Sequence, residues 1–180
     1  DPAPSVGRAE MAGAQAQDQP RRGGTLIVSL PGEPQHMNPA ITTHLPTRQA
    51  ASNLFNPLVS IARDKKIRPE LAERWEISPD GLTYTFHLAR NVRWHDGKPF
   101  TSADVKFSIT DINRKYDGPA TTGFAMVKEI DTPDPHTVIL TLENADPNFL
   151  FRLGENTAVI LDPKSAAGTA TKPVGTGPYT

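Results

Sequence analysis

The sequence predicts an α+β protein in which an antiparallel block of strands carries two or three helices. In the stretch 82–88, apolar Leu82, Tyr84, Phe86 and Leu88 alternate with polar residues, as in a strand that buries one face. Apolar residues at helical spacing occur in the stretches 46–58 and 101–116. A short apolar run at 25–30 adds one strand of the kind that is buried on both faces.

Composition narrows the possible functions. With 180 residues, the chain is long enough for one full-sized domain or two small ones. Its net charge of −1 argues against a nucleic acid or an anionic membrane as partner. The absence of cysteine excludes a disulfide framework, a thiolate zinc site and a cysteine nucleophile. No apolar run approaches the ~18 residues that a membrane span needs.

The first 22 residues are rich in Ala, Gln, Pro and charge, and they show no hydrophobic periodicity. This composition predicts a disordered leader. The stretch AGAQAQD has the small side chains of a signal-peptidase site, although no apolar region precedes it. The alternative interpretation is therefore the remnant of an export signal.

After the apolar run at 25–30, the stretch PGEPQHMNPA contains three prolines and one glycine, which predicts an irregular loop at the strand's carboxyl end. The stretch 46–58 predicts a helix that ends near Pro57. Its apolar stripe consists of Ala50, Ala51, Leu54, Phe55 and Leu58.

Turn residues define the next elements. Pro79, Asp80 and Gly81 predict a tight turn before the alternating strand, and Asp96-Gly97 predicts a hairpin. Thr101 and Asp104 form a capping pattern at the start of the next helix. The buried stripe of that helix consists of Val105, Ile109 and Ile112.

The last third of the chain predicts two strands, 126–131 and 136–143, joined by the Pro-rich turn TPDP. Asp146 as cap and Pro147 at the first position predict a further helix. The stretch LDPKSAAG repeats this pattern in short form. The final PVGTGPYT predicts a turn that leads into a strand at Tyr179.

No catalytic constellation occurs in the sequence. It has no phosphate-binding G-x-x-x-x-G-K-[ST], no G-x-S-x-G and no H-E-x-x-H. His36 and His44 are eight residues apart, and a metal site would need at least one further ligand. His87 lies on the polar face of its strand, and His95, which flanks a turn, is interpreted as a packing or turn residue and not as a base. Trp75 and Trp94 are interpreted as core residues.

The stretch 69–109, PELAERWEISPDGLTYTFHLARNVRWHDGKPFTSADVKFSI, resembles the signature region of the family 5 extracytoplasmic solute-binding proteins. These are the peptide-, dipeptide- and nickel-binding components of ABC importers. The resemblance extends to GGTLIVSL with NPA, to EIDTPDPHTVILTLENADPNFL and to PVGTGPY. It thus covers nearly the whole chain outside the leader.

The resemblance implies the N-terminal lobe of a bilobal clamshell of the type II periplasmic-binding-protein class, in a truncated chain that lacks the second lobe and has lost its signal peptide. Residues 23–58 would supply the first strand, the cleft loop and a helix of this lobe. Residues 173–180 would return to this part, with Tyr179 beside the first strand. Residues 59–172 would form an antiparallel subdomain with helices.

The resemblance also implies a monomeric binding protein, without enzymatic activity or cofactor, which captures a short peptide or a similar small polar solute. Its partner would be a membrane permease, and its place would be periplasmic or extracytoplasmic, associated with the membrane through that permease. Loops at strand ends are where such ligands bind. The candidate ligand-binding residues are Glu33, Gln35, His36, Met37, Asn38, Thr43, His44 and Phe124. Two alternatives remain: binding of nickel or a metal chelate, and an envelope hydrolase.

Overall fold

The structure is a computed structural model, and it describes residues 27–42, 44–113, 124–155, 157–163 and 172–179. Four strands form the main sheet, and two short strands lie beside it. The strands are β1 Val59–Ile61, β2 Ile67–Pro69, β3 Ala72–Ile77, β4 Thr83–Leu88, β5 Val127–Asp134 and β6 Thr137–Leu142. The helices are the 3-10 turn η1 Pro39–Ile41, α1 Leu45–Ala51, α2 Ser102–Phe107, its π-helical continuation η2 Ser108–Asn113, and α4 Phe149–Leu153.

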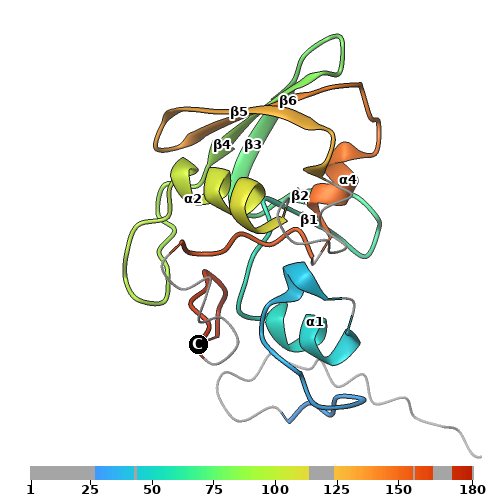
Figure 1. The fold of residues 1–180 in the computed structure, drawn as a ribbon, viewed down its shortest axis with the longest axis vertical. Helices are drawn as coiled ribbons and strands as arrows, with labels where there is room; N and C mark the ends of the chain where they lie inside the picture. Colours follow the sequence, from blue (N-terminus) through green and yellow to red (C-terminus); the bar gives the residue numbers. More distant parts are fainter. Residues whose placement is uncertain (1–26, 43, 114–123, 156, 164–171, 180) are drawn as a thin grey trace, which may run out of the picture.

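The main sheet has the strand order β3-β4-β6-β5, and every neighbouring pair in it is antiparallel. Tyr84 of β4 lies opposite Leu140 of β6, and Phe86 lies opposite Val138. Figure 1 shows this sheet at one end of the molecule, with α1 at the other end. The predicted antiparallel block and the α+β class are therefore confirmed.

The two turns that the sequence predicted are present. Gly81 has a φ of 72°, and its N–H donates to the carbonyl of Ser78 over 2.9 Å. Gly97 has a φ of 85°, a conformation that glycine adopts at little cost. The hairpin around Gly97 has one isolated antiparallel β-bridge, which pairs Arg93 with Pro99.

Helix α2 begins where Thr101 and Asp104 predicted. A carboxylate oxygen of Asp104 accepts from the N–H of Thr101 at 2.8 Å and from its hydroxyl at 3.3 Å. The same oxygen accepts from the indole N–H of Trp94 at 3.3 Å. Val105 and Ile109 are buried, as expected, while the side chain of Ile112 lies outside the described set.

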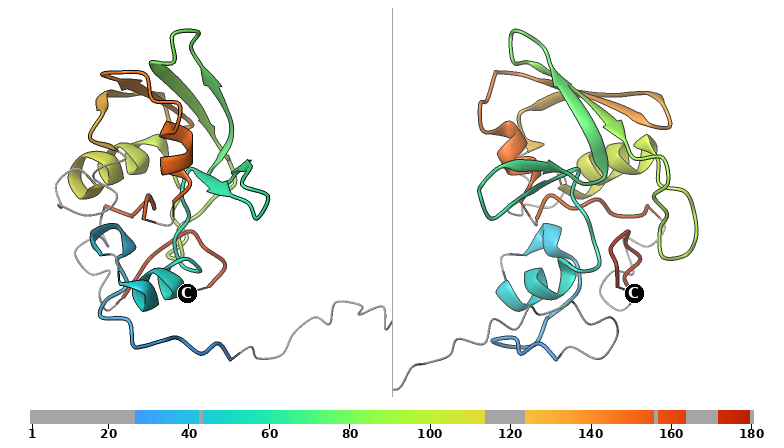
Figure 2. Two further views of the ribbon diagram at one scale, coloured as in Figure 1. Left: turned by 90° about the vertical axis from the view of Figure 1, so that its right-hand side faces the viewer. Right: turned by 180° about the vertical axis from the view of Figure 1, so that it is seen from behind.

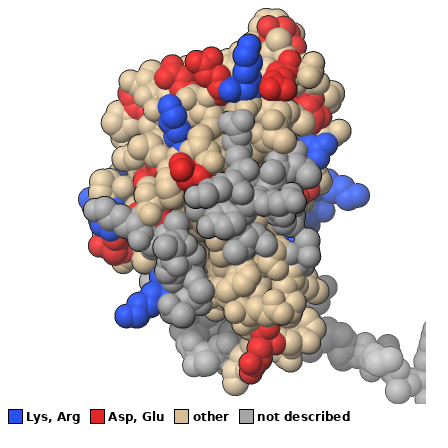
Figure 3. Space-filling view, viewed as in Figure 1, with Lys and Arg blue, Asp and Glu red and all other residues tan. Residues whose placement is uncertain are grey.

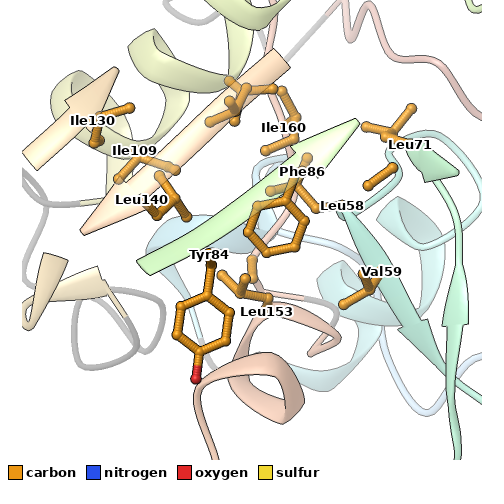
Figure 4. Packing of buried hydrophobic residues seen from close by; sticks show 14 of the residues in the cluster. Leu58, Val59, Leu71, Tyr84, Phe86, Ile109, Ile130, Leu140, Leu153 and Ile160 are labelled. Atoms are coloured by element: carbon orange, nitrogen blue, oxygen red, sulfur yellow. The ribbon is translucent and has the colours of Figure 1, made fainter. Parts of the chain in front are cut away.

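The larger core lies between the main sheet and the helices that cover one of its faces, as the two views of Figure 2 show for α2. Tyr84, Phe86 and Leu88 of β4 point into this core, as their alternation predicted. Figure 4 shows Phe86 beside Leu58 and Leu153, which come from segments far apart in the sequence. Trp94 and Phe100 pack edge to face, with ring centroids 5.9 Å apart.

A second, smaller core lies against α1 and is built from Ala40, Ala51, Leu54, Phe55, Val159 and Leu161. The extended stretch 158–161 joins the two cores. Ala158 and Ile160 belong to the larger core, whereas Val159 and Leu161 belong to the smaller one. Both faces of this stretch are therefore buried, a role that the sequence analysis did not assign to it.

The predicted first strand is not a strand in the described part of the chain. Residues 27–30 are extended without sheet pairing, and the side chains of Ile27 and Val28 are 89% and 66% exposed. A strand needs a neighbour for its N–H and C=O groups, and none of the described segments supplies one here. Residues 25 and 26, like the predicted leader 1–22, lie outside the described residues.

Three predicted boundaries were wrong. Helix α1 ends at Ala51, and the residues up to Leu54 form a turn. Strand β5 continues through the expected turn to Asp134, because a bulge between Asp131 and Asp134 accommodates Pro133. Helix α4 begins at Phe149, because Asp146 and the two residues after it form a preceding turn. Most of LDPKSAAG lies outside the described residues.

The stretch 175–179 lies against the turn that follows α1. The N–H of Gly177 donates to the carbonyl of Leu54 over 2.9 Å, and the N–H of Tyr179 donates to that of Asn53 over 3.4 Å. The expected pairing of Tyr179 with the first strand is thus wrong, because its hydrogen bond goes to the turn at Asn53. Tyr179 is 62% exposed.

Candidate ligand-binding site

The loop 31–38, which contains five of the eight predicted binding residues, lies against the start of α1. A Cβ atom on Gly32 would lie 3.6 Å from the side chain of Pro46. Next to this loop, a shallow pocket of about 310 Å³ is lined by residues 28–30 on one side and by Gln49, Ala50 and Asn53 on the other. The extended segment and α1 therefore form the two walls of a small open pocket.

Glu33 and Gln35 are exposed and offer a carboxylate and an amide to a ligand. His36 is half-buried, and its Nδ1 accepts from the N–H of Asn38 over 3.2 Å. Because Nδ1 is an acceptor, the ring proton of neutral His36 is on Nε2. The loop thus presents one anionic group, one amide and one imidazole.

Asn38 and Met37 are used by the fold. The side chain of Asn38 is 6% exposed and caps η1 by accepting from the N–H of Ala40 at 3.0 Å. Met37 is half-buried and packs on the smaller core together with Phe107. These contacts hold the loop in place, and the burial of Asn38 leaves little of its side chain for a ligand.

Of the other three predicted residues, His44 lies at the start of α1 and Phe124 lies in the larger core. Nδ1 of half-buried His44 lies 3.3 Å from the hydroxyl of Thr47, within its own helix turn. Phe124 is 1% exposed and belongs to the larger core, so it offers no surface to a ligand. Thr43 lies outside the described residues.

Gln49 and Asn53 line the pocket and are not among the predicted binding residues. The amide nitrogen of Asn53 donates to the carbonyl of Gln49 over 3.2 Å. Polar residues at this spacing on a helix are ordinary surface residues, so no signal in the sequence marks them as pocket residues.

Charges are not concentrated on the face shown in Figure 3, where acidic and basic side chains are interspersed. Within the described ranges, no three His, Asp or Glu side chains are placed to hold a metal ion. The resolved pKa shifts lie outside the loop. For example, burial first and the charge of Asp146 second raise the pKa of Tyr84. No described helix is long and apolar enough to cross a membrane.

Comparison with known proteins supports a binding role. Residues 66–180 match the family model described as bacterial extracellular solute-binding proteins, family 5 Middle. The chain is 34% identical to the dipeptide-binding protein of Escherichia coli in an alignment 184 residues long. This alignment covers 86% of this chain and 34% of that protein.

Two solved structures share the fold, and each is at least 32% identical to this chain in sequence. The PBP AgaA of A. tumefaciens, solved with agropinic acid, is 35% identical with a TM-score of 0.75, over 83% of this chain and 31% of that one. DppA of Helicobacter pylori, a periplasmic binding protein of an ABC transporter solved with the peptide STSA, is 32% identical with a TM-score of 0.70, over 81% and 34%.

The present chain spans about a third of the length of these proteins. Its fold corresponds to part of a periplasmic binding protein, as the signature region implied. The relatives are solute-binding transport proteins and not enzymes. Because the family model matches more than half of the sequence, the chain belongs to the bacterial extracellular solute-binding proteins, family 5.

Proposed function

We propose that the protein containing this chain is the solute-binding component of an ABC importer, and that it captures a short peptide or a related small polar solute. The observation that carries this proposal is the family match over residues 66–180. The dipeptide-binding relative and the peptide-bound similar structure support peptide as the ligand class. Agropinic acid in the other structure supports the wider class of small polar solutes.

The loop 31–38 is the proposed binding segment of this lobe. Glu33 would contact an amino or guanidinium group of the ligand, and Gln35 and His36 would donate or accept hydrogen bonds. Asn38 and Met37 would hold the loop in shape, which is the role that their contacts support. Thr43 and His44, which directly precede α1 in the sequence, would also contact the ligand.

The proposed mechanism is closure of two lobes around the ligand, with higher affinity in the closed state. Residues 23–58 and 173–180 would form one part of the first lobe, and 59–172 would form its second subdomain. Contacts of Gly177 and Tyr179 with the turn after α1 support this division. The closed protein would deliver its ligand to a permease from the periplasmic or extracytoplasmic side.

Mass spectrometry of the intact protein, purified without denaturation, tests the ligand class directly. We expect a co-purifying short peptide or small polar solute. Calorimetric titration with dipeptides, tripeptides and tetrapeptides then measures affinity. Peptides recovered unchanged support a receptor, whereas their hydrolysis supports the envelope hydrolase. Binding of a nickel complex in place of any peptide would support the metal alternative.

Variants of the loop test its part in binding. Glu33→Gln removes the charge without changing the shape, and we expect it to weaken binding of a ligand with a free amino group by roughly tenfold, the effect of one charge-assisted hydrogen bond. Glu129→Gln is the matched control, since Glu129 is an exposed carboxylate on β5. Equal affinities of the two variants would contradict the assignment of Glu33.

A further inference from the structure

His95 makes three hydrogen bonds to one short stretch that is 80 residues away in the sequence. Its ring Nδ1 accepts from the N–H of Gly175 at 3.1 Å, and its ring Nε2 lies 2.8 Å from the carbonyl oxygen of Gly177. Its own backbone N–H donates to the carbonyl of Gly175 over 2.9 Å. His95 therefore holds residues 175–177 from both its backbone and its ring.

These contacts determine the protonation state of the ring. A backbone N–H can only donate, so Nδ1 of His95 must carry a free lone pair. A carbonyl oxygen can only accept, so Nε2 must carry the proton. Among the three protonation forms of imidazole, only the neutral Nε2–H tautomer satisfies both bonds. A proton added to Nδ1 would point at the N–H of Gly175.

The stretch that His95 holds is also hydrogen-bonded to residues 54–56, which follow α1. Gly177 donates to the carbonyl of Leu54, and the hydroxyl of Thr176 donates to the side-chain oxygen of Asn56 at 2.9 Å. The hairpin that bears His95 is thereby connected through residues 175–177 to the turn after α1. The hairpin lies beside the larger core and the turn after α1 lies beside the smaller one, so this connection links the two cores.

The charged groups around the ring come from few elements. The hairpin of His95 carries Asp96 and Lys98, which pair with each other, and Arg93, whose guanidinium donates to the carbonyl of Gly97 at 2.9 Å. Asp104 and Asp162 act electrostatically on Lys98. The described stretch 172–179 carries Lys172 and Tyr179, and residues 53–56 carry no titratable side chain.

We propose that neutral His95 is the positioning residue that fixes the course of residues 175–179 across the turn at 53–56, and that protonation of its ring releases them. Histidine is the side chain whose charge changes between about pH 5 and 8. The held state uses the lone pair of Nδ1 for the N–H of Gly175 and so excludes a proton there, whereas the released state can accept one. Acid therefore favours release, and the hold is complete only where the ring is neutral. This inference concerns the packing of the chain and does not depend on the proposed ligand.

The tautomer can be measured in the wild-type protein. Nitrogen-15 NMR of the imidazole rings, with His95 assigned by the loss of its signals in His95→Gln, distinguishes a protonated from an unprotonated Nδ1. At pH 8 we expect the Nε2–H tautomer in the intact protein. A proton on Nδ1 at this pH would overturn the proposal.

Amide hydrogen exchange measures how firmly residues 175–177 are held. The protection factors of the Gly175 and Gly177 amides, corrected for intrinsic exchange, should fall about tenfold between pH 8 and pH 5 in the intact wild-type protein, the effect of one net hydrogen bond or somewhat more. His95→Ala should lower them by a similar factor at pH 8. An unchanged protection factor in the wild type across this range would overturn the proposal.

Two conservative variants separate titration from packing. His95→Asn retains an acceptor near the position of Nδ1, and His95→Gln retains a donor near that of Nε2. Neither side chain titrates, so the protection of Gly175 and Gly177 should no longer change with pH. His87→Gln is the matched control, because His87 contacts Glu76 on the sheet and not this stretch. A pH dependence that persists in His95→Asn and His95→Gln would show that another group releases the stretch.

Discussion

The backbone of Gly175 lies against the carbonyl group of Leu54 so closely that a Cβ atom on Gly175 would come within 1.8 Å of that oxygen. Neither φ of Gly175 nor φ of Gly177 is positive, so the need for glycine here comes from close approach and not from a left-handed turn. In the sequence, the two glycines of PVGTGPYT are expected to allow a turn at this place. The contact with Leu54 gives a different physical reason for the same residue.

Gly175→Ala should therefore destabilise the protein. The atom in the way belongs to the backbone and cannot rotate aside, so we expect a loss of about 3 kcal/mol in the free energy of unfolding, as for strong overpacking. Chemical denaturation measures the change. Gly32→Ala is the control, since its Cβ would meet Pro46 at an ordinary 3.6 Å and should change stability by less than about 0.5 kcal/mol. Equal stability of both variants would contradict the close approach.

Phe124 should behave as a core residue and not as a ligand contact. Its ring is 1% exposed, so Phe124→Ala should cost about 3–5 kcal/mol through the cavity that it leaves. Phe124→Leu retains most of the apolar volume and should cost less than about 1.5 kcal/mol. Calorimetric titration should give Phe124→Leu the ligand affinity of the wild type. Weaker binding without a change in stability would restore Phe124 to the binding site.

Ser108 should stabilise the protein by hydrogen-bonding η2 to the stretch 158–161. Its buried hydroxyl accepts from the N–H of Leu161 at 2.7 Å and donates to the carbonyl of Leu161 at 3.0 Å. Ser108→Ala leaves both backbone groups buried without this partner, and we expect a loss of about 1–3 kcal/mol in thermal or chemical denaturation.

Thr110→Ala is the matched control for Ser108. The hydroxyl of Thr110 donates to the carbonyl of Lys106 within its own helix, and its loss should change stability by less than about 0.5 kcal/mol. If Ser108→Ala were as stable as Thr110→Ala, water would have to replace the hydroxyl at Leu161.

Acid should weaken the turn at Asp80. The hydroxyl of Ser78 first, and the N–H of Leu82 second, hold the pKa of the Asp80 carboxyl below its usual 3.8. The folded state thus binds this proton less readily than the unfolded state. The resulting stabilisation is complete above about pH 4 and is lost as the pH falls through the lower, folded pKa.

Melting temperatures between pH 6 and pH 2 test this effect. Asp80→Asn retains an oxygen acceptor but cannot titrate, so its melting temperature should fall less steeply below pH 4 than that of the wild type. Glu143→Gln, which changes an exposed carboxyl outside the turn, should follow the wild type. Parallel curves for Asp80→Asn and the wild type would contradict the prediction.

Local elements were predictable from the sequence because their causes are local. The alternation of β4 appears as buried Tyr84 and Phe86, and the turn at Gly81 has the positive φ that its residues favour. Thr101 and Asp104 begin α2 where expected. In each case the residues that decide the structure lie within a few positions of one another.

The candidate site was predictable only in part. The position of Glu33, Gln35 and His36 in one loop follows from the chain itself, whereas the contacts that determine which side chains remain exposed come from elsewhere. Asn38 caps η1, Met37 packs on the smaller core, and Phe124 is enclosed by the larger core. No pattern near Phe124 in the sequence distinguishes enclosure from exposure.

The sequence by itself determined the α+β class, the antiparallel strands of the main sheet and the turn at Gly81, and, through the stretch 69–109, the family to which the chain belongs. Only the tertiary structure decided that residues 27–30 have no strand partner in the described chain, that residues 158–161 are buried on both faces, and that His95 holds Gly175. The physical reason is that pairing, burial and close approach depend on which distant segments meet in space. The spacing of hydrophobic residues and the turn residues shape one segment of the chain. They do not specify which distant segments will pack against it.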